Sequence, residues 1–455
     1  MTQITPTEAV AHCPALFLAA PASGQGKTTI TAALARYHRD LGRKVRVFKM
    51  GPDYLDPQIL EQASGQPVTQ LDLWMAGAEY CRHQFYLAAQ QVDLILVEGA
   101  MGLFDGEPSS ADLAATFNIP VALVMDVKGM AQTAAAVALG LANFREDVEF
   151  CGLIANYCGT ERHAQLIRDA LDGRMPLLAN LARDPEVSLP ERHLGLVQAH
   201  EVRDELEQRF NLGKAWLGEQ AICELPAPVA FASQDIAPPK KLLVGTKIGI
   251  ARDAAFSFIY SANTRLLEAM GAELSYFSPL NDKHLPEADA LWFAGGYPEL
   301  HAKQLAENSS MLKDVREFNA NKKPILAECG GFLYCLENLT DLDDVTYTMT
   351  GILAGQGAMR GKRGCQGMQA AMLPEGEVRA HAHHRSRSQN TPEPIAHGKR
   401  QRHLAPGESI YRQQGLTASY LHLFFPSNPQ AVAQLFTKPL MLASTSASAP
   451  TQLQG

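Results

Sequence analysis

A glycine-rich segment near the N-terminus carries the residue types that phosphate binding needs. Residues 20–29 read Ala-Pro-Ala-Ser-Gly-Gln-Gly-Lys-Thr-Thr, between an apolar run and a helix-forming stretch. Gly24 and Gly26 let backbone N–H groups close around phosphate oxygens. Lys27 adds a positive charge and Thr28 offers a hydroxyl to Mg²⁺. The strict motif has glycine at position 21, where this chain has Pro21. The alternative to a phosphate-binding loop is an ordinary strand-to-helix turn. The order of strand, loop and helix favours nucleotide binding.

Acidic residues follow later apolar runs, where ligands of a phosphate-bound metal are expected. Asp53 lies just after the run that ends near Phe48, and Glu98 directly follows the run over 92–97. Carboxylate oxygens are the hard ligands that Mg²⁺ prefers beside phosphates. Asp105 lies further along the same glycine-rich loop and is expected to face a substrate. Each acid alone is most simply a solvated loop charge, but their shared position at strand ends favours a metal site.

A cysteine in the second half lies on a predicted sharp turn. Cys329 stands between an apolar run and a helix-forming stretch, flanked by small residues, which is typical of a nucleophile elbow. We expect the helix end to favour the thiolate. His422 is the polar residue of an apolar run and is the best candidate base. The glycine-rich turn over 293–299 suits an oxyanion hole. The alternative is a buried structural cysteine with a core histidine.

Recurring apolar runs indicate the elements that position these residues. Continuous apolar runs separated by helix-length segments predict parallel strands covered on both faces, hence a doubly wound α/β domain. In the first half the predicted strands are 15–20, 45–50, 92–97, 120–127 and 151–155. After a Pro-rich stretch over 225–241, the pattern restarts with predicted strands at 247–251, 288–293 and 323–327 and helices at 261–270 and 309–321. Residues 385–413 are expected to form an exposed loop, and 437–455 a disordered tail.

Composition and charge exclude several classes of protein. The 455 residues include 40 Lys+Arg and 48 Asp+Glu, giving a formal net charge of -8. A general nucleic-acid or membrane-surface binder needs a concentrated positive field, so neither is expected. The eight cysteines form no CxxC pair, and no apolar stretch approaches the roughly 18 residues that span a bilayer. We therefore expect a cytoplasmic protein with reduced thiols.

An ordered set of motifs resembles the cobyrinic acid a,c-diamide synthase family through about residue 436. The motifs are SGQGKTT at 23–29, GPDYLDP at 51–57, VEGAMGLFDG at 97–106, PERHLGLV at 190–197, ARDAAFSF at 251–258, FSPLND at 277–282, GGYPEL at 295–300, AECGGF at 327–332 and ASYLHL at 418–423. Such a resemblance implies a P-loop, dethiobiotin-synthetase-like domain over 1–240. It also implies a class I glutamine amidotransferase domain, flavodoxin-like and α/β, over 245–436.

The resemblance further implies a reaction and its participants. Members of this family use ATP, Mg²⁺ and glutamine to convert the a and c acetate carboxylates of a corrinoid to amides in cobalamin biosynthesis. A carboxylate is a poor acyl donor, so phosphoryl transfer from ATP is expected to make an acyl phosphate that ammonia attacks. Cys329 is expected to form a thioester with glutamine, with His422 as its base, and no third acidic triad residue is expected. A homodimer is expected by analogy.

The resemblance assigns the remaining residues to sites. Expected ATP-binding residues are Ser23, Gly24, Gly26, Lys27, Thr28, Thr29 and the base-reading Asn156, for which capping or turn formation is the alternative; expected metal ligands are Thr28, Asp53 and Glu98; expected substrate contacts are Tyr54, Leu55 and Asp105; and expected oxyanion donors are Gly295, Gly296 and Gly330. The chain departs from the family pattern at 380–384, Ala-His-Ala-His-His, and at 366–368, Gln-Gly-Met.

Other functions stay open at this point. Hydrogenobyrinic acid, which lacks cobalt, and nickel sirohydrochlorin also carry paired acetates, and the sequence does not distinguish these macrocycles. A ParA-like or MinD-like P-loop ATPase with a degenerate amidase domain is an alternative from a different class. That alternative predicts an amphipathic membrane or DNA element, which the sequence lacks, and requires no intact pair of Cys329 and His422.

Overall fold

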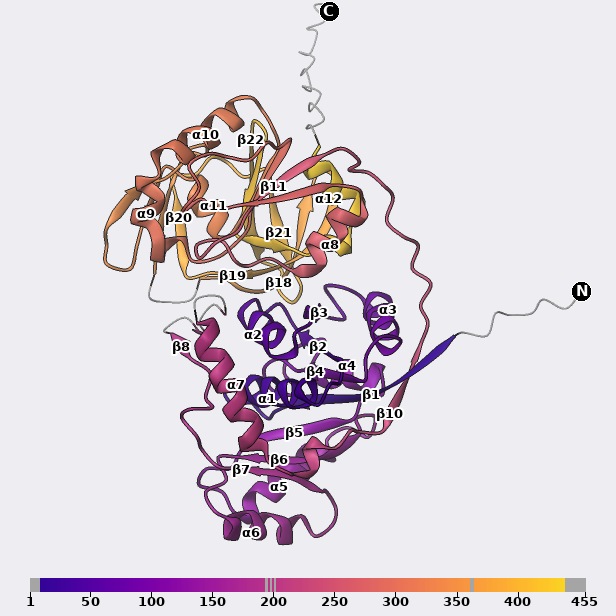
Figure 1. Cartoon of the computed structure of the whole chain (residues 1–455). Helices are drawn as coiled ribbons and strands as arrows, with labels where there is room; N and C mark the ends of the chain where they lie inside the picture. The colour runs from indigo at the N-terminus through magenta and orange to yellow at the C-terminus, as the bar shows by residue number, and fades with distance from the viewer. Residues whose placement is uncertain (1–8, 193–194, 197–198, 200–201, 361–363, 438–455) are drawn as a thin grey trace, which may run out of the picture.

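The computed structural model describes residues 9–192, 195–196, 199, 202–360 and 364–437. The described chain forms two lobes, each built on its own large sheet (Figure 1). The tail expected over 437–455 lies, apart from Thr437, outside the described residues. In the part of the chain that the structure describes, no helix has the length and apolar character needed to cross a bilayer.

The first sheet confirms the predicted doubly wound parallel architecture. Its order is β3-β2-β4-β1-β5-β6-β7, with every neighbouring pair parallel, and β10 adds antiparallel to β1. The strands are β1 Val10–Ala19, β2 Val45–Met50, β3 Thr69–Leu71, β4 Leu94–Glu98, β5 Val121–Asp126, β6 Phe150–Asn156, β7 Leu177–Leu181 and β10 Pro228–Ala232. The short strands β8 Glu191–Arg192 and β9 Gly195–Leu196 pair separately. Because the parallel strands are covered on both faces, they are nearly continuous in apolar residues.

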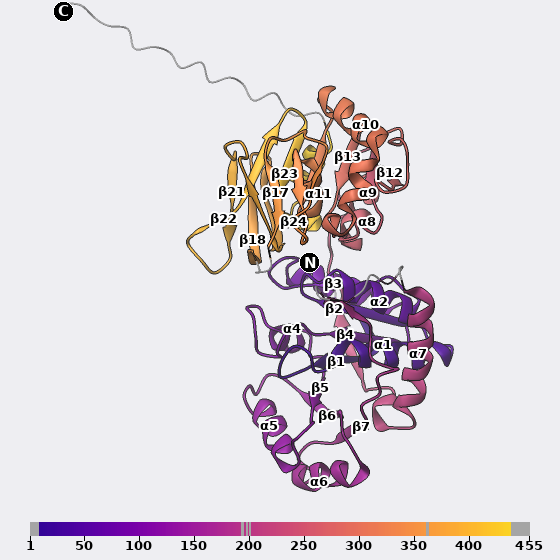
Figure 2. The same ribbon diagram turned by 90° about the vertical axis from the view of Figure 1, so that its left-hand side faces the viewer.

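Helices cover both faces of this sheet. α1 Lys27–Asp40, α2 Leu55–Ser64 and α7 Arg203–Leu217 pack on one face, and the opposite face carries α3 Ala78–Ala89, α4 Ser110–Thr116, α5 Gln132–Ala142 and α6 Glu161–Leu171. Figure 2 shows α1, α2 and α7 on one side of the sheet and α4 and α5 on the other. A short 3-10 helix, Ala221–Cys223, precedes β10. The loops after β1, β2 and β4 therefore meet at the carboxyl edge of the sheet, where open α/β sheets bind ligands.

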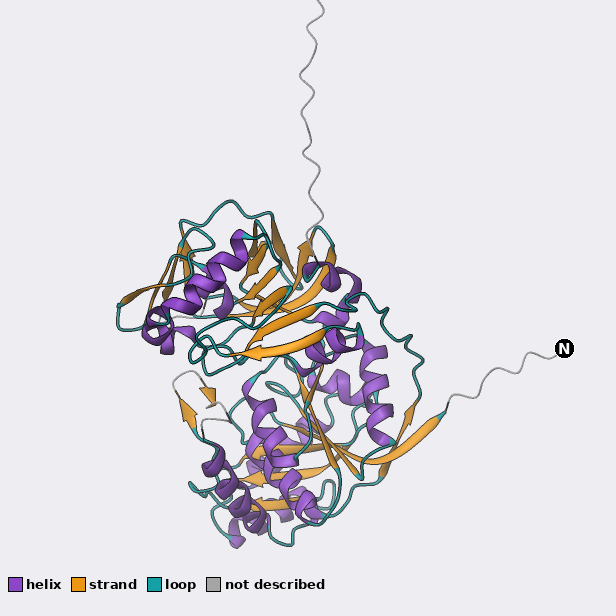
Figure 3. Cartoon of the chain, turned by 45° about the horizontal axis from the view of Figure 1, so that its top comes forward, coloured by secondary structure: helices purple, strands orange, loops and turns teal. Residues whose placement is uncertain are grey.

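The second sheet combines a parallel half with an antiparallel half. Its order is β12-β11-β13-β14-β23-β22-β21-β18-β19-β24, parallel as far as β23 and antiparallel beyond it. The parallel strands are β11 Lys247–Ala251, β12 Glu273–Phe277, β13 Ala290–Phe293, β14 Ile325–Glu328 and β23 Leu416–Ser419. The antiparallel strands are β18 Gln366–Leu373, β19 Gly376–His383, β21 Ala396–Arg400, β22 Pro406–Gln413 and β24 Leu421–Leu423. Figure 3 shows these strands with the helices around them.

Smaller elements complete the second lobe. A four-stranded sheet has the order β16-β15-β17-β20, formed by β16 Thr346–Thr348, β15 Asn338–Thr340, β17 Gln356–Met359 and β20 Ser386–Gln389. The helices are α8 Ser261–Ala269, α9 Ala302–Glu307, α10 Ser309–Ala320, α11 Gly330–Cys335 and α12 Pro429–Leu435, with 3-10 turns at Pro298–His301 and Phe425–Ser427. The helices predicted at 261–270 and 309–321 are confirmed as α8 and α10.

The exposed loop expected over 385–413 was a wrong prediction. This segment forms β20, β21 and β22, and β22 pairs directly with β23 in the second sheet. Few positions in these strands are buried, and the exposed positions carry long polar side chains. In β21, for example, Gly398 alone is buried. The regular apolar alternation that predicts a strand is therefore absent, although the backbone hydrogen bonds are made.

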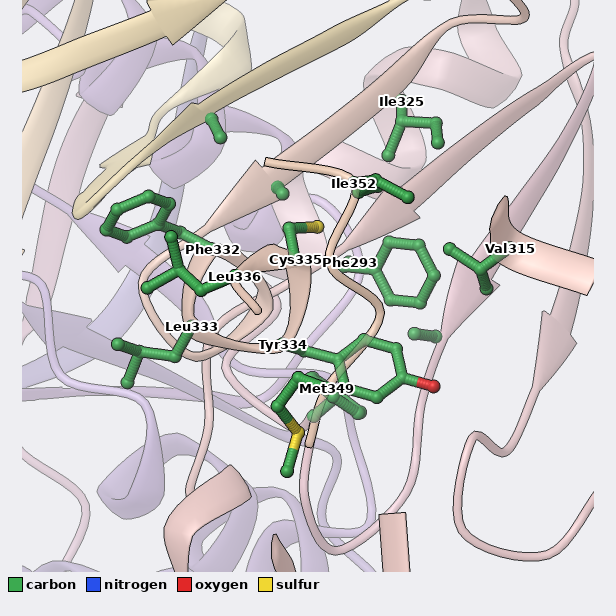
Figure 4. Packing of buried hydrophobic residues seen from close by; sticks show 14 of the residues in the cluster. Phe293, Val315, Ile325, Phe332, Leu333, Tyr334, Cys335, Leu336, Met349 and Ile352 are labelled. Carbon is green, nitrogen blue, oxygen red and sulfur yellow. The ribbon is translucent and has the colours of Figure 1, made fainter. Parts of the chain in front are cut away.

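Apolar packing fixes the turn that carries Cys329. The helix α11 after this turn is wholly buried, and Figure 4 shows Phe332, Leu333 and Tyr334 packed among side chains from β13, β14 and α10. Phe332 stacks on Tyr411, with ring centroids 5.5 Å apart. A Cβ at Gly331 would lie 2.2 Å from the Phe293 carbonyl oxygen, so only glycine allows α11 this close to β13. The cysteine thus sits on a rigid support.

An extended segment joins the two lobes. It runs from the end of β10 at Ala232 to the start of β11 at Lys247 and contains no helix or strand. Figure 1 shows this segment passing along the outside of the molecule. The Pro-rich stretch therefore also supplies β10, which the sequence analysis did not predict, before the connection begins.

Candidate active site

The phosphate-loop motif forms the expected turn between β1 and α1. Gly24 and Gly26 have φ values of 78° and 91°, in the left-handed region that favours glycine. Lys27 begins α1, and its Nζ donates to the Met101 carbonyl oxygen at 2.8 Å. The Thr28 hydroxyl donates to Glu98 Oε1 at 2.9 Å. The loop and the acidic turn after β4 are thus in direct contact before any ligand arrives.

Asn156 lies beneath this loop. Its side-chain amide donates to the Gln25 carbonyl oxygen at 2.9 Å, and a Cβ at Gly26 would come within 2.4 Å of the same amide nitrogen. The Gln25 side chain in turn accepts from the Asp126 N–H at 2.8 Å. Asn156 therefore holds the loop, while its expected contact with the base stays a prediction.

Lys49 is a site residue that the sequence analysis missed. Its side chain is 2% exposed, and Nζ lies 2.8 Å from Asp53 Oδ2, 3.4 Å from Glu98 Oε1 and 3.6 Å from Asp56 Oδ2. The available signal was a lysine near the ligand-binding end of strand β2, whose other residues except Arg46 are apolar, because a buried lysine needs partners. Asp56, in the first turn of α2, was missed with it.

The ion pairs shift the pKa values of the cluster in opposite directions. Burial opposes the charged form of Lys49, but the surrounding carboxylates raise its pKa overall. Burial likewise opposes ionisation of Asp53, but the adjacent Lys49 ammonium has the larger effect and lowers the pKa of Asp53. Burial, together with the charges of Asp53 and Glu98, raises the pKa of Asp56. Burial and the charge of Lys49 lower the pKa of Lys27.

The same residues suit a magnesium ion. Thr28, Asp53 and Glu98 offer hard oxygen donors, and Glu98 Oε2 is buried with no hydrogen-bond partner among the described residues. No cluster of three or more His, Cys, Asp or Glu side chains within the described ranges has the geometry to hold a metal by itself. Thr28, Asp53 and Glu98 together fit Mg²⁺, because this ion commonly takes one or two carboxylates and completes its shell with water and substrate phosphates.

Cys329 occupies a strained turn between β14 and α11. Its φ and ψ are 48° and -102°, which is unfavourable for a non-glycine residue and is typical of a nucleophile elbow. The thiol is 5% exposed and lies 3.9 Å from the His383 carbonyl oxygen. Burial, followed by the charge of Glu299, raises the pKa of Cys329. The N–H of Gly330 at the start of α11 lowers this pKa, in the direction expected of the helix end, but burial outweighs it, so the thiol needs a base.

His422 is buried on β24 and shares a cavity with Cys329. The side chain is 1% exposed, and neither ring nitrogen has a hydrogen-bond partner in the described structure. Burial lowers the pKa of His422 well below its usual value, so the imidazole is neutral and able to accept a proton. A Cβ at Gly295 would lie 2.2 Å from His422 Cε1, so the ring packs directly on this glycine.

His422 has no acidic hydrogen-bond partner among the described residues, since neither of its ring nitrogens is bonded there. The expectation that a third acidic triad residue is lacking stays a prediction. Glu328, next to the cysteine, accepts from the Leu423 N–H at 2.8 Å and from Trp292 Nε1 at 3.0 Å. Burial raises the pKa of this carboxyl to about 8. Glu328 thus ties the elbow to the backbone of the strand that carries His422.

The glycines expected at the oxyanion hole lie beside the elbow. A Cβ at Gly330 would lie 2.9 Å from the Gly296 nitrogen, which brings the two predicted donor segments together. A Cβ at Gly296 would lie 2.1 Å from the Ala255 carbonyl oxygen, so this position also requires glycine. The role of Gly295, Gly296 and Gly330 as oxyanion donors stays a prediction.

One cavity of about 880 Å³ joins the two sets of residues. The lining residues of the first lobe are Ser23, Gly24, Gly26, Lys27, Thr28 and Thr29 of the phosphate loop and the start of α1, Lys49 of β2, Asp53 and Tyr54 of the loop after β2, Leu55 and Asp56 at the start of α2, and Glu98 of β4. From the second lobe it is lined by Gly296, Glu299, Cys329, Gly330, His381, His383, His384, Arg385 and His422, among others. Asp105 does not line it: this exposed residue accepts from the Gly102 N–H at 3.1 Å, and its substrate contact stays a prediction.

The segment that departs from the family pattern contributes to this cavity. His381 on β19 is the direct cross-strand neighbour of His422 on β24. Burial lowers the pKa of His381 to about 3, against the opposing charge of Asp53 in the first lobe. The sequence analysis named this segment but assigned it no site role.

Comparisons with known proteins agree with this architecture. Residues 16–197 match the model of the CobQ/CobB/MinD/ParA nucleotide binding domain, and residues 247–430 match that of the CobB/CobQ-like glutamine amidotransferase domain. A hydrogenobyrinate a,c-diamide synthase of Stutzerimonas stutzeri is 49% identical over 93% of this chain and 98% of its own. One of Pseudomonas aeruginosa is 49% identical over the same shares. A cobyrinate a,c-diamide synthase of Herminiimonas arsenicoxydans is 45% identical over 91% of this chain and 95% of its own.

The fold and the site define a two-domain protein with a P-loop nucleotide-binding domain and a glutamine amidotransferase domain. Within that class the chain belongs to the hydrogenobyrinate and cobyrinate a,c-diamide synthase family. The resemblance inferred from the ordered sequence motifs is therefore confirmed.

Gly295→Ala tests the packing of His422. The new methyl group would collide with the imidazole, so we expect glutamine hydrolysis to fall by about 100-fold, the scale of losing a positioned base. Glutamate release by the purified variant is the measurement. Gly140→Ala, in α5 with nothing within 4 Å of the added Cβ, is the matched control and should hydrolyse glutamine at the wild-type rate. Unchanged hydrolysis in Gly295→Ala would contradict the assignment of His422.

Proposed function

We propose that this chain amidates the a and c acetate carboxylates of a corrinoid, using ATP and glutamine, as a step of cobalamin biosynthesis. The observation that carries the proposal is the single cavity lined by both the phosphate loop and Cys329. The names of the relatives support the same reaction. The proposal assigns the synthetase to 1–240 and the glutaminase to 245–436; the matched domains at 16–197 and 247–430 fall within these ranges.

The synthetase residues activate the acetate carboxylate. The carboxylate oxygen attacks the terminal phosphorus of ATP, the bond to ADP breaks, and an acyl phosphate forms. Lys27 and the loop amides hold the phosphates, and Lys49 keeps a positive charge beside Asp53. Thr28, Asp53 and Glu98 would hold Mg²⁺, which when bound neutralises charge on the phosphates. Tyr54, Leu55 and Asp105 are the corrinoid contacts that the family resemblance suggests.

The glutaminase residues release ammonia. His422 accepts the Cys329 thiol proton, the sulfur attacks the glutamine carboxamide carbon, and N–H groups of the glycine turn stabilise the oxyanion. The proton passes to the leaving nitrogen, and ammonia departs from the thioester. Water then attacks the thioester and frees glutamate. Because the neutral form of His422 is favoured by burial, it is ready to take the first proton.

We propose that ammonia passes from Cys329 to the acyl phosphate through the cavity that both sites share. In water at neutral pH ammonia is largely protonated and loses its nucleophilic lone pair. Within the cavity it can attack the acyl phosphate carbon, displacing phosphate and forming the amide. His381, the cross-strand neighbour of His422, adds no positive charge to this cavity, because burial keeps its imidazole neutral. A homodimer stays a prediction by analogy.

A mass-spectrometric assay tests the substrate. Purified protein receives ATP, Mg²⁺ and glutamine with cobyrinic acid, hydrogenobyrinic acid or nickel sirohydrochlorin in separate reactions. Each amidation replaces a hydroxyl with an amino group, so we expect a product in which two carboxylates have been converted. The macrocycle that is amidated most efficiently shows whether cobalt is already present in the substrate. Hydrolysis of ATP and glutamine with no change in any macrocycle would refute the proposed acceptor.

Cys329→Ala separates the two half-reactions. Only ammonia generation uses the thiolate, so we expect glutamine-supported amidation to be abolished and ammonia-supported amidation to persist near the wild-type rate. Product formation is followed with each nitrogen source at saturating ATP. Equal loss with both sources would contradict the proposed division of roles.

Lys27→Ala tests the activation step. Lys27 is buried at the start of α1 within the phosphate loop, so its loss should abolish amidation from glutamine and from ammonia alike. Glutamine hydrolysis measured alone serves as the internal control and should persist. Amide formation without ATP turnover would refute an acyl phosphate intermediate.

A further inference from the structure

No hydrogen bond from a described residue fixes the orientation of the His422 ring. A catalytic histidine is normally held by a hydrogen bond to the ring nitrogen that does not act on the nucleophile. Within the described structure neither nitrogen of His422 has such a partner. Glu328 bonds the backbone of the next residue and not the ring. The ring must therefore be oriented by what packs against its faces.

One of the rings packed on His422 comes from the other lobe. Tyr54, in the turn between β2 and α2, has its ring centroid 4.9 Å from that of His422, at an interplanar angle of 40°. The same tyrosine stacks on Phe258 at 4.9 Å and 9° and lies 4.6 Å from Tyr260. Phe258 itself lies 6.2 Å from His422. Gly295 and the cross-strand neighbour His381 also border the imidazole.

The turn that carries Tyr54 is tied to both lobes. Asp53, the preceding residue, pairs with Lys49 in the first lobe. The Tyr260 hydroxyl donates to the Pro52 carbonyl oxygen at 3.4 Å, and Gln58 Nε2 donates to the Ser257 carbonyl oxygen at 3.3 Å. The ring of Tyr54 therefore has little freedom to leave His422 while the lobes stay docked.

We propose that Tyr54 is a positioning residue for the glutaminase: its ring, supplied by the synthetase domain, completes the packing that orients His422. The proposal rests on the proposed function, in which His422 is the base for Cys329. It gives Tyr54 a role other than the corrinoid contact that the family resemblance suggests. The two roles differ in a measurable way, because hydrolysis of glutamine alone requires no corrinoid.

The experiment measures glutamate release by the full chain with neither ATP nor corrinoid present. Tyr54→Leu removes the aromatic face, and we expect kcat to fall by about tenfold or more, with the KM for glutamine unchanged, since the base is displaced and not the binding site. Tyr54→Phe keeps the face and should retain the wild-type kcat. Tyr80→Leu is the matched control, because Tyr80 also crosses between the lobes but packs on Phe424, at 5.8 Å. This control should also retain the wild-type kcat.

The outcomes distinguish this proposal from the proposed function. Wild-type kcat in Tyr54→Leu, or an equal fall in Tyr80→Leu, would overturn the positioning role and leave the proposed function intact. A wild-type chain that releases no glutamate would overturn both. Thermal denaturation of each variant checks folding, and Tyr54→Met, which refills the space without an aromatic face, should show the same fall in kcat if Tyr54→Leu unfolds. A wild-type kcat in Tyr54→Met would then overturn the role.

Discussion

The buried ammonium of Lys49 is the interaction on which the arrangement of the first site depends. Three carboxyl groups converge on it: Asp53 from the loop after β2, Asp56 from the first turn of α2 and Glu98 from the end of β4. Lys49 and Glu98 are the buried pair among them, and removing Lys49 would leave the Glu98 carboxylate buried without its cation, a change that typically costs about 3–5 kcal/mol. The loops after β2 and β4 are therefore held together before any nucleotide binds. Preorganisation of this kind lowers the reorganisation needed when phosphate charge arrives.

The site of Cys329 and His422 is held in place by backbone strain and packing, whereas the phosphate-binding site is held in place by ion pairs. Cys329 stays in an unfavourable backbone conformation because the wholly buried α11 leaves it no alternative. His422 is held by close contacts and by the backbone bond from Glu328 to the following residue. A neutral base and a neutral buried thiol both avoid the cost of desolvated charge in the resting state. Proton transfer then creates charge only when glutamine and the oxyanion donors are in place.

The parts of this design that follow from local sequence were predictable, and the parts that follow from contacts between distant segments were not. Continuous apolar runs located β2 and β11 at their full lengths, and the glycine spacing located the phosphate loop. Lys49 was missed because its partners come from separate elements: Asp53 from the loop after β2, Asp56 from α2 and Glu98 from β4. β21 was missed because its exposed polar side chains conceal the backbone pairing. The packing of Tyr54 on His422 joins residues of different domains, so neither the sequence around Tyr54 nor the sequence around His422 predicts it.

A contiguous series of contacts links the two chemistries. Thr28 donates to Glu98, Glu98 and Asp53 share Lys49, and Asp53 precedes Tyr54, whose ring lies on His422. Each link is a hydrogen bond, an ion pair, a peptide bond or a ring contact, so no step crosses solvent. These contacts place the nucleotide-binding residues and the proposed base for Cys329 in one connected set of side chains around one cavity.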